Sequence, residues 1–248
     1  MVNVQNPRIN ADKAKLNELP PSTGPIPGEG PKAADVYKNV KVLGNLSQAQ
    51  FTTFMVSMTN WVAPQEGCSY CHNVANFAED AKYTKTVARR MIQMNQSINA
   101  NWKDHVKETG VTCYTCHRGN NIPQQVWFKD LKQQTGNGML GNKDGQNTPV
   151  ASSGYSSLPN AYFEQYLSKS SNIRVAGGTA LPTGNKHNIH ETESTYGLMM
   201  HFSKSLGVNC TYCHNSRNFS SWEQSPPQRA KAWYAIRMAQ DINNNYME

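Results

Sequence analysis

The six cysteines of this 248-residue chain all fall in one pattern, Cys-x-x-Cys-His, which occurs three times. On one helical turn, cysteines three positions apart present both thiols to the same side, and the next imidazole lies beside them. This is the attachment signature of c-type haem, whose two vinyl groups bond the thiols while the histidine ligates the iron. The sequence therefore predicts three covalently attached c-type haems. The predicted attachment and ligand residues are Cys68, Cys71, His72, Cys113, Cys116, His117, Cys210, Cys213 and His214.

Other uses of paired cysteines fit the pattern less well. A zinc site needs four ligands that converge on a point, and three separated pairs do not divide into four-cysteine sites. A thioredoxin-like redox pair does not require a histidine after each second cysteine. Disulfides within each pair would leave the three histidines unexplained. Haem accounts for every cysteine and for the histidine that follows each pair.

Each haem iron needs either a sixth ligand or an open position, and methionine is a usual ligand. A methionine precedes each motif on a predicted helix: Met55 before Cys68, Met91 before Cys113 and Met199 before Cys210. Each has a neighbouring rival, and a helical methionine also serves as ordinary core filler. The rivals are Met58, Met94 and Met200. A pair ahead of every motif favours ligation by one member of each pair.

Composition indicates a core that side chains alone do not fill. Only 38% of the residues are hydrophobic and the mean hydropathy is −0.67, so three haems would supply apolar surface that the chain lacks. Their propionates carry about six negative charges, which reduce the formal charge of +7 to roughly +1. No basic run interleaves aromatic residues, so nucleic acid is not an expected partner.

The chain contains no run of about 18 apolar residues, so we expect no membrane-spanning helix. The segment 1–10 is polar and does not read as a signal peptide. Because haem is normally attached after export, we expect either that an export signal has been removed from this sequence or that its numbering starts inside the precursor. There is no cysteine near the N-terminus of this sequence to which a lipid could be attached, so we expect no lipid anchor of that kind.

An internal repeat organises the chain. The string from Cys68 to Phe77 matches the string from Cys210 to Phe219, and similar helical strings follow both. We therefore predict a mainly α fold with long irregular loops, a multihaem cytochrome c with two pseudo-symmetric halves built on helix–turn–CxxCH units. Thr86 to His105 has helical periodicity. The predicted segments are an extended Pro/Gly-rich arm at 1–35, a first half with two haem motifs at 36–131, a loop-rich connector at 132–192, and a second half with one motif at 193–248.

Several strings resemble the haem-bearing cytochrome subunit of the reaction centre in purple photosynthetic bacteria. They run from Val36 to Leu46, from Trp61 to His72 and from Gly110 to Gly119, with further matches at 198–200, 205–207 and 228–230. The similarity covers about 33–246 and is weakest in the connector. The second unit ends at Glu248, where a fourth motif would follow, so the chain looks like a three-haem member of a four-haem family or a truncated one.

The resemblance implies a function as well as a fold. Members sit on the periplasmic face of the photosynthetic inner membrane, bound to the reaction-centre L and M subunits. They take electrons from soluble donors, such as a small cytochrome c or a high-potential iron–sulfur protein, and re-reduce the photo-oxidised special pair. If the iron ligands of the family are carried over to this sequence, the three irons are ligated by Met55, Met91 and Met199. His105 then matches the ligand of the fourth iron in four-haem members. In relatives the third-motif haem lies nearest the special pair.

We thus predict a peripheral electron-transfer subunit that is not an enzyme. The first alternative is a free periplasmic multihaem carrier, which would not co-purify with a reaction centre. The second is a multihaem reductase, which would need an open iron position. The methionine pairs argue against an open position.

Overall fold

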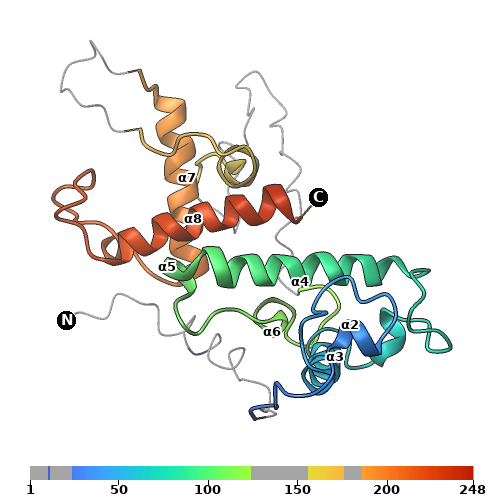
Figure 1. The fold of residues 1–248 in the computed structure, drawn as a ribbon. Helices are drawn as coiled ribbons and strands as arrows, with labels where there is room; N and C mark the ends of the chain where they lie inside the picture. Colours follow the sequence, from blue (N-terminus) through green and yellow to red (C-terminus); the bar gives the residue numbers. More distant parts are fainter. Residues whose placement is uncertain (1–10, 12–23, 124–155, 176–185, 248) are drawn as a thin grey trace, which may run out of the picture. The chain divides into compact units, whose positions relative to one another are not determined.

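A computed structural model describes Ala11 and residues 24–123, 156–175 and 186–247 of the chain. These residues form α-helices, short helical turns and irregular loops, without a β-strand among them, as Figure 1 shows. The prediction of a mainly α fold with long loops is therefore confirmed. Contacts divide the chain into two compact units, Leu16–Val126 and Met1–Lys15 with Trp127–Glu248. We call them the N-terminal unit and the C-terminal unit and describe each by itself.

The N-terminal unit contains the first two haem motifs. Its elements are α2 (Ala33–Val36), α3 (Gln48–Val62), the 3₁₀ turn η1 (Gly67–Tyr70), α4 (Tyr83–Asn101), α5 (Lys103–Val106) and α6 (Cys113–His117). A capping box begins α3, because Ser47 Oγ accepts a bond from the Gln50 amide and Gln50 Oε1 accepts one from the Ser47 amide. Helix α3 contacts η1 and α6, and α4 also contacts α6. The two long helices therefore hold both motifs.

The C-terminal unit contains the third motif. Its described elements are a π-helical turn η3 (Phe163–Ser168), α7 (Ile189–Leu206), the 3₁₀ turn η4 (Cys210–Tyr212) and α8 (Gln228–Asn245). Asn188 caps α7 in a capping box with Glu191. Gly207 ends α7 in the left-handed region at φ 70°, a conformation that glycine adopts without strain. This tight stop delivers the chain directly to Cys210.

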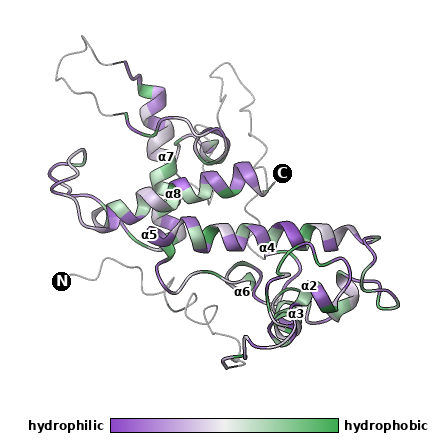
Figure 2. Ribbon diagram, viewed as in Figure 1, coloured by the Kyte–Doolittle hydropathy of each residue, from purple (hydrophilic) through white to green (hydrophobic). Residues whose placement is uncertain are grey.

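Very few apolar side chains are fully buried among the described residues. The N-terminal unit buries Ala33, Ala63, Ile92 and Ile98, and the C-terminal unit buries a cluster of Tyr162, Tyr166, Leu167 and Leu198. Neither α3 nor α8 has a fully buried residue, although Figure 2 shows hydrophobic residues distributed along both. Long amphipathic helices normally bury one face. The apolar faces of α3 and α8 are thus only partly covered by the protein.

The structure refines the sequence expectations for one helix and for the connector. The helix expected over Thr86 to His105 is present, but Trp102 (φ −113°, ψ 30°) divides it into α4 and α5. The predicted loop-rich connector contains the π-helical turn η3. The arm at 1–35 and the connector at 132–192 lie largely outside the described residues, so the predicted segment boundaries stay predictions. Within the described ranges, no helix is both long and apolar enough to cross a membrane.

Candidate haem-attachment sites

The first motif lies on η1, whose backbone places Cys68, Cys71 and His72 on one turn. The His72 amide donates to the Cys68 carbonyl at 3.0 Å. The loop that follows turns back, so that His72 Nδ1 lies 3.2 Å from the Phe77 carbonyl oxygen. The imidazole also lies against the Phe77 ring, with centroids 5.1 Å apart.

The third motif repeats this geometry in the C-terminal unit. The His214 amide donates to the Cys210 carbonyl at 2.9 Å. His214 Nδ1 lies 3.1 Å from the Phe219 carbonyl oxygen, and the two rings stack with centroids 5.3 Å apart. The repeat seen in the sequence is therefore a repeat of hydrogen bonds around two predicted iron ligands.

Asparagines explain why both loops turn back toward the histidine. Asn73 Oδ1 accepts from the Ala75 amide at 3.1 Å, and Asn215 Oδ1 accepts from the Arg217 amide at 3.0 Å. Such Asx turns let a side chain imitate a backbone turn. The asparagine after each histidine thus starts the turn that brings the phenylalanine carbonyl to the imidazole.

The second motif is built differently, as a short α-helix (α6). Thr112 caps it and Arg118 ends it in the left-handed region at φ 51°. Here His117 Nδ1 lies 3.0 Å from the carbonyl oxygen of Asn120. The Gly119 amide donates to the Trp61 carbonyl at 2.8 Å, which ties the end of the motif to α3.

Two asparagines of α4 fix the chain just before the second motif. Asn99 makes two hydrogen bonds to the Val111 backbone: its Oδ1 accepts from the Val111 amide at 2.7 Å, and its Nδ2 donates to the Val111 carbonyl at 2.9 Å. Asn95 donates to the same carbonyl at 3.0 Å. Gly110 adopts φ 63°, and a Cβ there would lie 2.6 Å from Asn99 Oδ1. A larger residue at Gly110 would therefore disturb this clamp.

The three histidines share one electronic arrangement. A carbonyl oxygen can accept a hydrogen bond but cannot donate one, so each Nδ1 that is bonded to a carbonyl must carry the proton. Nε2 is then left with a free lone pair, the form that ligates a metal, and the carbonyl fixes the ring orientation. Burial lowers the pKa of His72 and of His214, although the bonds to the phenylalanine carbonyls oppose the shift. Both shifts favour the neutral imidazole, the form that ligation requires.

The cysteines are suited to covalent attachment. All six are free thiols, and each is at least partly exposed. Burial raises the pKa of the Cys71, Cys113, Cys116 and Cys213 thiols. Neutral thiols react slowly with disulfides and oxidants. At these four positions the shift favours the neutral, reduced thiol, the form that adds to a vinyl group.

Exposed apolar side chains surround the first and third motifs. Those near the first are Val74 and Phe77, exposed by 60% and 53%, and those near the third are Phe219 and Trp222, exposed by 48% and 50%. Surfaces of this kind mark places where a ligand or partner covers the protein. Together with free thiols and oriented imidazoles, they fit a porphyrin bound at each motif.

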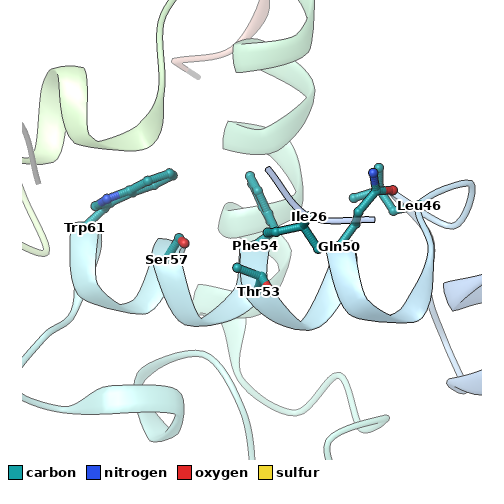
Figure 3. A pocket seen from close by; sticks show the side chains of 7 residues that line it. All are labelled: Ile26, Leu46, Gln50, Thr53, Phe54, Ser57 and Trp61. Carbon is teal, nitrogen blue, oxygen red and sulfur yellow. The ribbon is translucent and has the colours of Figure 1, made fainter. Parts of the chain in front are cut away.

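A groove of about 360 Å³ runs along one face of α3 (Figure 3). Phe54, Ser57 and Trp61 line it from the helix, and Ile26 closes one side. Met55 and Met58 are not among its lining residues. The groove therefore lies on a different face of α3 from the candidate ligand.

The six candidate methionines are all partly buried, so burial does not separate each candidate from its rival. For the second motif, the face of the helix separates Met91 from its rival Met94. Met91 lies four residues before Asn95, on the row of α4 that faces Val111, whereas Met94 lies off that row. For the third motif, Met199 packs against the buried Tyr162–Leu198 cluster. Met55 lies on α3, which contacts η1.

Sequence reasoning missed the groups that orient the histidines. They are the carbonyls of Phe77, Asn120 and Phe219, and the clamp formed by Asn95 and Asn99. The signal for two of them was present, because the repeated string continues from each cysteine pair through Asn to Phe. Nothing comparable in the sequence marked Asn120, because the second motif lies outside the repeated string.

Comparison with known proteins places these sites in context. A family model described as the photosynthetic reaction centre cytochrome C subunit matches residues 1–248. A photosynthetic reaction center cytochrome c subunit of Rubrivivax gelatinosus is 52% identical over all of this chain and 68% of its own length. The subunit of Thermochromatium tepidum is 46% identical over 100% of this chain and 61% of its own length. That of Roseobacter denitrificans is 42% identical over 90% of this chain and 62% of its own length. The chain thus spans about two thirds of the length of these relatives.

Proposed function

The chain belongs to the photosynthetic reaction centre cytochrome c subunit family, and from this membership we propose that it is an electron-transfer subunit of such a reaction centre. It re-reduces the photo-oxidised special pair with electrons from a soluble periplasmic donor, a small cytochrome c or a high-potential iron–sulfur protein. It lies on the periplasmic face of the photosynthetic inner membrane against the L and M subunits. It has no substrate of its own and is not an enzyme.

One observation supports this proposal most strongly. Each Cys-x-x-Cys-His turn holds its imidazole by a carbonyl bond at Nδ1, at 3.2, 3.0 and 3.1 Å, beside two free thiols. A haem bound at such a turn supplies a one-electron couple between ferric and ferrous iron. The protein attaches the group, fixes the imidazole and excludes water with the apolar side chains around it. These are the functions of an electron carrier.

We propose that Met55, Met91 and Met199 would supply the second protein ligand to the irons that His72, His117 and His214 would hold. The thioether sulfur can reach an iron while the rest of the side chain packs, so the contact of Met199 with the apolar cluster is compatible with ligation. Filled axial positions leave no site for a substrate, which distinguishes a carrier from a reductase.

Leucine substitutions at the three methionines test the axial assignment. Met55→Leu, Met91→Leu and Met199→Leu should each remove one third of the near-infrared sulfur-to-iron absorption band and lower one reduction potential, because methionine ligation raises it. Leucine keeps the side-chain volume, so folding should change by less than about 1.5 kcal/mol. Met58→Leu, Met94→Leu and Met200→Leu are the matched controls. Loss of the band in a control variant would transfer the assignment to that residue.

His105 is a further candidate ligand. Its Nδ1 is buried and has no hydrogen-bond partner among the described residues. We propose that His105 serves none of the three motifs. His105→Gln should therefore leave the three methionine-ligated signals unchanged.

Isolation of the reaction centre tests the function directly. We expect this chain to co-purify with the L and M subunits in a fixed ratio and the reduced protein to bind no carbon monoxide. A chain recovered entirely in the soluble fraction would indicate the free carrier instead. Stoichiometric carbon monoxide binding would reveal an open iron position and indicate a reductase.

A further inference from the structure

A buried lysine lies behind the first predicted iron ligand. Lys85 of α4 is 7% exposed. Its Nζ donates to the Phe77 carbonyl oxygen at 2.8 Å and to the Glu79 carbonyl oxygen at 2.8 Å. The Phe77 oxygen also accepts the bond from His72 Nδ1 at 3.2 Å. One carbonyl oxygen thus joins an ammonium group to the imidazole of the first motif.

The corresponding cation of the third motif is placed differently. Arg229 of α8 donates to the Ser221 carbonyl oxygen at 2.6 Å and to Ser225 Oγ at 2.8 Å. It therefore secures the loop after the third motif, as Lys85 does after the first. Its hydrogen bonds go to Ser220, Ser221 and Ser225 and not to the Phe219 carbonyl, which His214 uses. The two loops share their fold but differ at this one oxygen.

We propose that Lys85 raises the reduction potential of the first haem by acting on His72 through the carbonyl of Phe77. This proposal deepens the electron-transfer function and rests on a haem being attached at Cys68 and Cys71. Lys85 is a positioning residue, because it does not touch the predicted iron ligand itself.

Two effects of the ammonium group act in the same direction. A carbonyl bonded to Nδ1–H makes the imidazole a stronger electron donor, which stabilises ferric iron. A cation on the same oxygen withdraws electron density and weakens that acceptor. The positive charge also disfavours the extra charge of ferric iron, and burial limits screening by water. Both effects favour the reduced state.

The charge of Lys85 is balanced only in part. Asp80 lies 3.2 Å from Lys85 Nζ, but it also pairs with Lys41 and Arg89, each at 2.9 Å. These bonds hold the pKa of Asp80 far below its ordinary range. The bond from Arg89 has the largest effect, and the bond from Lys41 follows it. One carboxylate thus serves three cations.

Redox titration of the full-length protein with its haems attached tests the proposal. Lys85→Met should lower the potential of one haem and leave the others unchanged. Comparison with a Cys68→Ala/Cys71→Ala variant, which lacks the first haem, shows which redox wave of the titration belongs to the first haem. Lys85→Arg should restore the potential, because a guanidinium keeps the positive charge and supplies N–H donors for the Phe77 and Glu79 carbonyl oxygens. Asp80→Asn should shift the same wave upward, since it removes the counter-charge.

Lys41→Met is the matched control. It removes an equal charge and an ion pair with Asp80, but the Lys41 side chain is 60% exposed and no bond joins it to Phe77. It should shift the potential by much less than Lys85→Met. An equal shift, or an unchanged potential in folded Lys85→Met that keeps its methionine band, would overturn the proposal. If Lys85→Met does not fold, an Asp80→Asn shift in the downward direction or no shift would overturn it. Absence of the first haem from the wild-type protein would instead refute the proposed function.

Discussion

Replacing Cys210 and Cys213 together by alanine is expected to reduce the number of covalent haems on this chain from three to two. Cys210 begins η4, Cys213 directly follows it beside His214, and the other four cysteines belong to the first two motifs. Peptide mapping should find haem on the Cys68–Cys71 and Cys113–Cys116 fragments only. The sulfur-to-iron band should fall by one third, because Met199 would have no iron to bind.

The same variant is expected to lose stability. Helix α8 has no fully buried residue, and Phe219 and Trp222 are about half exposed without a cofactor. Removal of a large apolar group that covers them should cost about 2–5 kcal/mol of unfolding free energy, as deletion of large core side chains does. Thr211→Ala is the matched control, because it keeps both thiols and loses only its bond to Asn209 at 2.6 Å. Three haems in the double alanine variant would contradict the assignment of this motif.

The second large effect concerns electron delivery. In a reaction centre that carries the Cys210→Ala/Cys213→Ala subunit, we expect the fast phase of special-pair re-reduction after a flash to disappear. The reason is distance, because electron tunnelling falls steeply with it, and resemblance to the family places the third site nearest the special pair. Laser-flash absorption of the pigment pair measures this rate.

The matched variant for this experiment is Cys68→Ala/Cys71→Ala, which lacks the first site. It should keep the fast phase after one flash and lose only the capacity for repeated flashes. If loss of the first site slowed the first turnover as much as loss of the third, the proposed order of sites would be wrong.

The attachment sites could be predicted from sequence because their chemistry requires fixed residue types at fixed spacing. Cysteine pairs and the histidine that follows them leave little freedom, and the repeat from Cys68 to Phe77 and from Cys210 to Phe219 also determined the fold of two loops. The mainly α fold followed from helical periodicity. Helical periodicity alone did not show which residues are buried, since Val87 of α4 is 40% exposed, whereas Ile92 is buried.

Other features depend on tertiary contacts that no local pattern contains. Trp102 divides a periodic helix, and its sequence neighbours include no proline or glycine that would predict a break. Lys85 would be expected in solvent, yet two loop carbonyls and Asp80 compensate its burial. The family resemblance favoured Met91 over Met94, but the contact of Asn95 and Asn99 of α4 with Val111, which supports that prediction, is a tertiary contact. Such facts arise only when distant segments meet.

Flash spectroscopy of the intact reaction centre tests the central claim most directly. After a single flash on the reduced complex, the α-band of a c-type haem on this chain should bleach with the same rate constant as the photo-oxidised special pair recovers. The two amplitudes should correspond to one electron each. Recovery of the special pair with no bleaching of any haem on this chain would contradict the account.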